Sequence, residues 1–295
     1  MRTVLRLSCL ACLAHCRVLP AQFRSDARLV VIHATVTDRH GNFVKDLPQN
    51  AFRVFEDGRP QTLREAVRED IPVTVGVLMD ESGSTSQYRP VMADALTGVA
   101  GALKPADEIF IAHFGMFFTV DLPPASPPAD LRPQLPDIVR RYLRPQYQVG
   151  TRLYDSVQQA AGFLQKTARR DKRVLLLITD GKDTTSLVAE KQFLANCRRS
   201  ETLLYAIGFD ARHGERTLDQ MTAAGGGHAF YPARPADLPA IALQFVQEIR
   251  SQYTLTYAPD SAGSGEAWHA LRVAVAHPSG LIVRCRPGYY SHPPD

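Results

Sequence analysis

Two segments of almost uninterrupted apolar and β-branched residues are the strongest pattern in the chain. Residues 73–79 and 173–179 have almost no polar alternation. This is typical of strands covered on both faces, as in a parallel sheet. Asp80 directly follows the first segment and Asp180 directly follows the second. The pattern therefore predicts two buried strands, each of which ends in a carboxylate.

Strand-like and helix-like segments alternate around these two strands over about 180 residues, which favours one α/β domain. The further expected elements are strands at 107–114, 117–122, 202–208 and 228–231 and helices at 152–166, 187–199, 216–223 and 237–250. In a doubly wound, mostly parallel Rossmann-like sheet of order 3-2-1-4-5-6, strands 1 and 4 are neighbours. With 73–79 as strand 1 and 173–179 as strand 4, Asp80 and Asp180 should lie side by side.

Two details of this sheet follow from the residues between its strands. Only Gly115 and Met116 separate 107–114 from 117–122, so we expect a hairpin whose second strand is an antiparallel edge. The proline-rich residues 123–136 predict a surface connection with little regular structure.

The two ends of the chain have a different pattern, of short alternating segments split by turn residues. We expect strands at 28–37, 52–56 and 61–67 before the α/β unit and at 252–257, 268–276 and 281–286 after it. Neither end has enough strands to bury a core alone. We therefore expect one small β-sandwich built from both flanks, 22–69 and 251–292, with the α/β unit at 70–250 inserted into it.

Hydroxyl and carboxylate side chains gather where the two central strands end. Asp80 is followed by Ser82 and Ser84, Thr151 opens the helix at 152–166, and Asp180 closes the second strand. Ligands of open α/β sheets bind at this edge, and such oxygen ligands suit Mg²⁺, with Mn²⁺ as the alternative. A structural interpretation also exists: the serines could form a turn that caps the next helix, and Thr151 could be an N-cap.

Asp80, Ser82, Ser84, Thr151 and Asp180 match the Asp-x-Ser-x-Ser, distant Thr and distant Asp of the metal-ion-dependent adhesion site. The chain thus resembles the von Willebrand factor A-type (VWA) domain. The resemblance implies the VWA fold, with the same edge hairpin, and a metal ion held by these five residues.

The flanks extend this resemblance. Segments at 36–38 and 56–58 are similar to the opening of bacterial secreted VWFA-related proteins first catalogued in acidobacteria, and 249–255 and 286–290 are similar to their C-terminal part. The resemblance implies a secreted, metal-binding, adhesion-type module and leaves its partner unidentified.

The amino terminus predicts export. Arg2 and Arg6 precede an apolar run too short to span a bilayer, and Pro20-Ala21 follows, so we expect a signal peptide at 1–21 and a periplasmic or extracellular protein. No later segment is a transmembrane candidate. The signal peptide carries three arginines and no acid, so the net charge of +4 becomes +1 for the rest. Charge therefore gives no support for nucleic-acid binding.

The sequence does not favour an enzyme. Asp80 lacks a second aspartate two residues later, Ser82 lacks the Gly-x-Ser-x-Gly elbow, and neither zinc-ligand spacing nor a phosphate loop is present. After cleavage Cys197 and Cys285 remain, and we expect two separate, mostly buried thiols.

Two function classes remain open. In the first, the protein is a metal-dependent protein-binding module, and the metal takes a carboxylate from an unknown partner protein. In the second, it is a structural or assembly component of the envelope whose metal only stabilises the fold. An accessory subunit that regulates an enzyme elsewhere is a third, weaker alternative.

Overall fold

The computed structural model describes residues 29–68, 70–144, 149–209, 214–259, 266–276 and 280–291. Its centre is a sheet of β5 (Val73–Asp80), β6 (Glu108–Phe114), β7 (Phe118–Ser126), β8 (Lys172–Thr179), β9 (Leu203–Gly208) and β10 (Gly226–Phe230). The strand order is β10-β9-β8-β5-β6-β7, and all neighbours are parallel except the β6–β7 hairpin at the edge. This is the order expected from the sequence, so the doubly wound sheet is confirmed.

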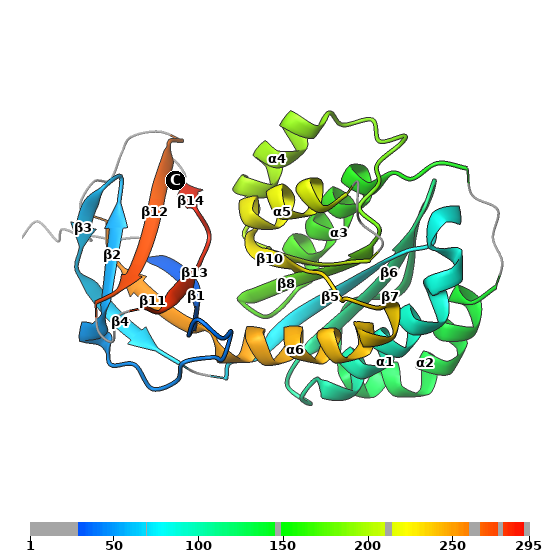
Figure 1. Cartoon of the computed structure of the whole chain (residues 1–295), viewed down its shortest axis with the longest axis horizontal. Helices are drawn as coiled ribbons and strands as arrows, with labels where there is room; N and C mark the ends of the chain where they lie inside the picture. Colours follow the sequence, from blue (N-terminus) through cyan, green and yellow to red (C-terminus); the bar gives the residue numbers. More distant parts are fainter. Residues whose placement is uncertain are drawn as a thin grey trace, which may run out of the picture.

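Helices cover both faces of this sheet (Figure 1). One face is covered by α1 (Arg89–Ala102), α2 (Pro128–Tyr142) and α6 (Leu238–Ser251), and the other by α3 (Leu153–Thr167), α4 (Glu190–Arg199) and α5 (Glu215–Ala224). Every residue of β5 is buried, which explains its lack of polar alternation. Within it, a Cβ on Gly76 would lie 2.9 Å from Leu175 and 3.1 Å from Leu164 of α3, so α3 packs closely only over a glycine.

The expectation of an irregular connection at 123–136 is wrong. The edge strand β7 continues through Pro123 to Ser126, and α2 then runs through the exposed Pro133 and Pro136. An edge strand tolerates proline, and Pro128 begins α2 at a position where proline is favourable. Leu131, Ile138 and Tyr142 are buried on one side of α2. Their burial outweighs the backbone hydrogen bonds that the two exposed prolines remove.

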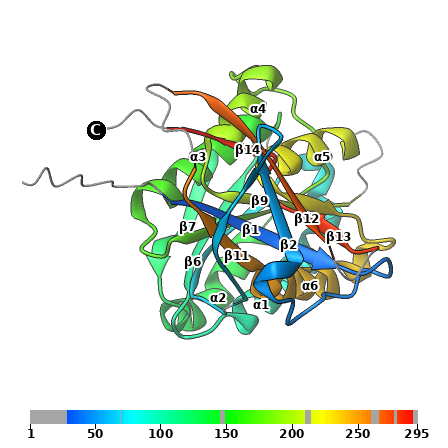
Figure 2. The ribbon, with the colours of Figure 1, turned by 90° about the vertical axis from the view of Figure 1, so that its left-hand side faces the viewer.

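The flanks fold into two antiparallel sheets, as expected (Figure 2). In the described part of the chain one sheet has the order β13-β1-β11-β4 and the other β14-β12-β2-β3. Their strands are β1 (Val30–Thr37), β2 (Phe52–Glu56), β3 (Arg59–Gln61), β4 (Leu63–Val67), β11 (Tyr253–Tyr257), β12 (Trp268–Val275), β13 (Ile282–Arg284) and β14 (Gly288–Tyr290). The two sheets share one core, which includes Ile32, Val54, Leu255 and Val273. The β-sandwich built from both ends of the chain is therefore confirmed.

The flanks differ from expectation in two details. The segment 61–67 is divided at residue 62 between β3 and β4, which belong to different sheets. The strand β14 had no counterpart among the expected elements. Because each of these pieces is short, the period-2 pattern is too brief to assign it to a sheet.

The α/β unit and the sandwich are joined directly. Gln252 alone separates α6 from β11, and the preceding segment 68–72 leads from β4 into β5. The predicted signal peptide at 1–21 lies outside the described residues. Cys197 and Cys285 are both free thiols, as expected. Within the described residues, no helix has the length and apolar character that a membrane span requires.

Candidate metal centre

The parallel pairing of β5 and β8 brings two carboxylates to the same edge of the sheet. Met79 is opposite Ile178 in this ladder, so Asp80 at the end of β5 lies beside the residues that end β8. Asp180 comes directly after β8. Asp80 is 0% exposed and Asp180 is 2% exposed. Two buried carboxylates therefore lie next to each other where the winding of the sheet reverses.

Asp80 is held by hydrogen-bond donors. The hydroxyl of Thr179 donates to its Oδ2 at 2.6 Å, and the backbone N–H of Ser82 donates to Oδ1 at 2.8 Å. Burial raises the pKa of Asp80 to about 6; these donors lower it, and the charge of Asp180 raises it further. Within the described part of the chain, no lysine or arginine pairs with this carboxylate.

Ser82 and Ser84 lie directly beyond Asp80. Their hydroxyl oxygens are 3.2 Å apart, with Ser82 buried and Ser84 exposed. The hydroxyl of Thr85 donates to the backbone oxygens of Asp80, at 3.0 Å, and of Ser82, at 2.9 Å, which fixes this loop. Ser82 precedes a short 3₁₀ turn at Gly83–Tyr88, yet its side chain makes no capping hydrogen bond. The structure thus gives no support to the capping interpretation.

Thr151 is positioned by its backbone. Its N–H donates to the hydroxyl of Thr184 at 2.8 Å, and its carbonyl accepts from the N–H of Thr184 at 3.0 Å, in the loop that follows Asp180. The N-cap of α3 is Arg152, so Thr151 does not cap that helix. Its side chain makes no hydrogen bond to the described residues and is 5% exposed. The hydroxyl is therefore available to another ligand.

Asp180 pairs with Lys182, a residue that the sequence interpretation did not single out. The Lys182 ammonium lies 2.8 Å from Oδ2 of Asp180, and the Lys182 N–H donates to Oδ1 at 3.2 Å. Thr179 and Tyr142 were also missed; the Tyr142 hydroxyl donates to the backbone oxygen of Asp80 at 2.8 Å. Only the closeness of Thr179 and Lys182 to Asp180 in the sequence could have indicated their roles.

A second polar group lies next to this site. Nδ1 of His113 is 2.5 Å from Oδ2 of Asp121, and its Nε2 is 3.4 Å from Oε2 of Glu81. Burial raises the pKa of Glu81, and the charge of His113 lowers it. His113 is buried and held between two carboxylates. These contacts indicate that His113 has a structural role in the fold.

The donor set fits a small, hard divalent cation. Asp80 and Asp180 supply two buried carboxylates, and the hydroxyls of Ser82, Ser84 and Thr151 are not used as helix caps. Carboxylate and hydroxyl oxygens are ligands that Mg²⁺ and Mn²⁺ accept. A cation here would also favour the ionised form of Asp80, whose pKa is raised mainly by burial and further by the charge of Asp180.

Solved structures with this fold share little sequence with the chain. A von Willebrand factor type A protein from Catenulispora acidiphila is 12% identical, with a TM-score of 0.50, over 80% of this chain and 73% of that one. Proximal thread matrix protein 1 from the mussel byssus is 14% identical, with a TM-score of 0.50, over 64% of this chain and 49% of that one. Another structure of the mussel protein, with a zinc-occupied MIDAS motif, is 16% identical, with a TM-score of 0.46, over 62% and 49%. At these identities, the likeness to the first two structures is one of fold.

Comparison with curated proteins finds no match. Residues 75–244, in contrast, match the von Willebrand factor type A domain. The matched region begins inside β5 and ends inside α6, so it contains the sheet described above except for the first two residues of β5. Since this match spans more than half of the 295 residues, the chain belongs to the von Willebrand factor type A domain family.

Proposed function

We propose that the protein is an exported, divalent-cation-dependent binding module of adhesion type, of the bacterial secreted VWFA-related kind. Asp80, Ser82, Ser84, Thr151 and Asp180 would hold Mg²⁺, with Mn²⁺ as the alternative ion. When bound, the ion supplies a positive centre that accepts a carboxylate oxygen from a partner protein. The observation that carries the proposal is the fully buried Asp80 carboxylate beside the buried Asp180.

The chain's own residues prepare this site for a cation. Thr179 and the N–H of Ser82 orient the carboxylate of Asp80, and Thr85 fixes the loop that carries the two serines. Lys182 pairs with Asp180 at 2.8 Å. These contacts hold the oxygens in place, so little conformational entropy is lost when the ion binds.

Apolar side chains on the surrounding loops favour a protein partner. Phe117 is 72% exposed, Val149 is 90% exposed and Leu187 is 82% exposed. The loops that carry them meet around Thr151: the N–H of Arg152 donates to the carbonyl of Gly115 at 2.9 Å, and the N–H of Leu187 donates to Asp155 of α3 at 2.9 Å. A polar centre surrounded by exposed apolar residues is typical of a binding surface. A metal that only stabilised the fold would not need them.

Capture from cell-envelope extract tests this function. Immobilised protein should retain a partner in Mg²⁺ but not in EDTA, and a short aspartate-containing peptide should release it. Asp80→Ala should lose capture, whereas Asp94→Ala, which removes an exposed aspartate of α1, should retain it. Capture that is equal with Mg²⁺ and with EDTA would contradict the proposal. If Mg²⁺ binds but no partner does, the alternative of a structural envelope component is favoured.

We also propose that the protein is exported and that it is not an enzyme. The pattern of residues 1–21 supports export, and sequencing the amino terminus of the mature protein from the periplasm or medium tests it. An amino terminus still at Met1 would contradict it.

A further inference from the structure

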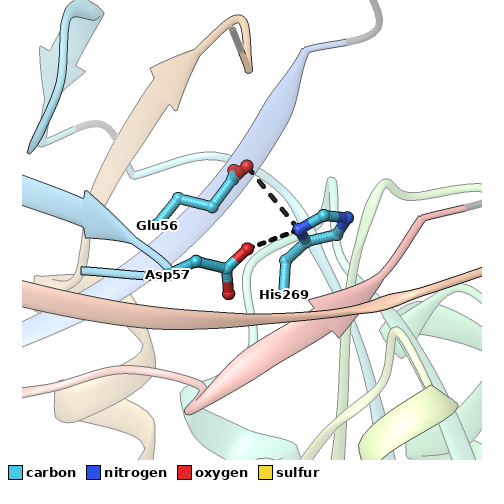
Figure 3. A group of neighbouring side chains, drawn as sticks. All are labelled: Glu56, Asp57 and His269. Atoms are coloured by element: carbon cyan, nitrogen blue, oxygen red, sulfur yellow. Dashed lines mark hydrogen bonds and ion pairs between the residues drawn. The ribbon is translucent and has the colours of Figure 1, made fainter. Parts of the chain in front are cut away.

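Three side chains able to bind a metal lie together in the β-sandwich, away from the sheet edge (Figure 3). Glu56 ends β2, Asp57 follows it in the hairpin turn, and His269 lies on β12. Their ligand atoms all lie within 4.8 Å of one another. Nδ1 of His269 is 2.8 Å from Oδ2 of Asp57 and 3.8 Å from Oε1 of Glu56. This nitrogen faces both carboxylates, whereas Nε2 points away from them.

The two carboxylate oxygens of Glu56 differ in their contacts with the described residues. The residue is only 3% exposed. The hydroxyls of Tyr257 and Tyr289 both donate to Oε2, the latter at 2.9 Å. No described residue donates to Oε1, whose nearest cationic group is the imidazole at 3.8 Å. Both tyrosine hydroxyls therefore occupy Oε2, and Oε1 is the oxygen of Glu56 that faces His269 within the cluster.

Asp57 and His269 are held in position by contacts outside the cluster. The backbone N–H of Ala270 donates to Oδ1 of Asp57 at 2.8 Å, which leaves Oδ2 facing the imidazole. The ring of His269 stacks on that of Tyr289, with centroids 5.3 Å apart. Outer contacts of this kind orient metal ligands in proteins.

We propose that Glu56, Asp57 and His269 form a divalent-cation site that prefers zinc to magnesium and ties the β2 hairpin to β12. Imidazole nitrogen with two carboxylates suits zinc, whereas magnesium takes oxygen ligands. Two charges on the ion balance two carboxylates. The ion would bind the lone pair of Nδ1, with the proton of the neutral ring carried on Nε2, and water would fill the fourth position.

The two contacts of His269 require only small movements. Tetrahedral zinc with bonds of about 2.0 Å places its ligand atoms about 3.3 Å apart. The Asp57–His269 contact of 2.8 Å must open by about half an ångström, and the Glu56–His269 contact of 3.8 Å must close by a similar amount. Side-chain rotation is sufficient for both.

Calorimetric titration of the full chain with Zn²⁺ tests this site. An Asp80→Ala background removes the sheet-edge site, so failure of one site is distinguished from failure of the other. In that background, zinc should still bind with one ion per chain. His269→Gln and Asp57→Asn should each weaken binding by at least about tenfold. His40→Gln removes an exposed histidine from the same sandwich and should leave the affinity unchanged.

If His269→Gln fails to fold, Asp57→Asn still tests whether zinc binds at this cluster. Asparagine still accepts from the N–H of Ala270 and is well suited to the positive φ of this turn, 49° at Asp57. Ring ¹⁵N spectra give a second readout, in which zinc should shift Nδ1 of His269 more than Nε2. Unchanged zinc affinity in Asp57→Asn, or loss of all zinc binding in Asp80→Ala, would overturn the proposal.

Discussion

The hydroxyl of Thr35 donates a 3.1 Å hydrogen bond to Oε1 of Glu248, which joins the sandwich to α6 across 213 positions of the chain. The same oxygen accepts from the hydroxyl of Tyr205 in β9 at 3.4 Å and lies 3.3 Å from His228 in β10. Arg284 of β13 is 3.5 Å from the other oxygen. One buried carboxylate thus connects the sheet of the α/β unit with two neighbouring strands of a sandwich sheet, β1 and β13.

Glu248→Leu should therefore destabilise the protein strongly. It removes the acceptor of the buried hydroxyls of Thr35 and Tyr205, and each unsatisfied buried donor costs about 1–3 kcal/mol. Glu266→Gln is the matched control, because Glu266 pairs with Arg199 at 3.1 Å in an exposed position. That pair should contribute less than about 1 kcal/mol. Urea unfolding measures both changes, and equal effects of the two variants would show that the Glu248 network does not stabilise the joint.

The same network predicts a rigid connection between the two parts. Since only Gln252 separates α6 from β11, a change of angle would have to break the contacts of Glu248. Spin labels at the exposed Lys191 of α4 and Glu65 of β4 should give one narrow distance distribution, identical with and without Mg²⁺. The distribution should broaden in Glu248→Leu. A shift on addition of Mg²⁺ would mean that the metal site and the joint are coupled.

Lys172 at the start of β8 predicts a pH dependence of stability. It is 4% exposed, and its ammonium donates to the backbone oxygen of Ile249. Burial lowers the pKa of Lys172 from 10.5 to about 7, Arg250 lowers it further, and the charges of Asp70 and Glu248 act in the opposite direction. Between these two values the unfolded chain binds more protons than the folded chain. The free energy of unfolding should therefore rise with pH.

The rise should begin near pH 7 and amount to at most about 1.4 kcal/mol per pH unit. Urea unfolding from pH 6 to about 8.5, below the ordinary pKa of lysine and of most thiols, measures it. Lys172→Met should flatten the rise above pH 7. Curves for Lys172→Met and the wild type that stay parallel across this range would assign the dependence to other groups.

Replacement of an exposed proline inside α2 should stabilise this helix. Proline costs about 3 kcal/mol in a helix interior, partly offset by about 1 kcal/mol from its restriction of the unfolded chain. Pro136→Ala should therefore raise the free energy of unfolding by about 1–2 kcal/mol. Pro128→Ala, at the first turn of the same helix, should bring no gain. Urea unfolding of both variants measures this, and a loss of stability in Pro136→Ala would mean that α2 depends on that proline.

The sequence predicted the sheet because its strongest signals are local. β5 and β8 are uninterrupted apolar runs, and the short Gly115-Met116 turn determines the hairpin of β6 and β7. In α2 local rules failed, because burial of Leu131, Ile138 and Tyr142 outweighed the proline penalty. That burial depends on contacts with α1 and the sheet, which no local pattern contains.

The candidate sites also divide into residues that local sequence patterns single out and residues that only tertiary contacts bring together. The five residues at the sheet edge follow strands or open a helix, so their types and positions suffice to single them out. Glu248 looks like a solvated charge on an amphipathic helix until the sandwich covers it. Glu56, Asp57 and His269 come from opposite ends of the chain, and only the pairing of β2 with β12 brings them together.

Calorimetric titration with Mg²⁺ tests the central claim, that Asp80, Ser82, Ser84, Thr151 and Asp180 hold one divalent cation. The wild type should bind one Mg²⁺, and Asp94→Ala should bind it equally well. Asp80→Ala should lose it with a folded structure retained, because it removes a carboxylate whose charge is disfavoured by burial and by the charge of Asp180. Thr151→Val, which removes a hydroxyl without a hydrogen-bond role in the described structure, should weaken binding without unfolding the chain. Unchanged Mg²⁺ affinity in Asp80→Ala would contradict the account.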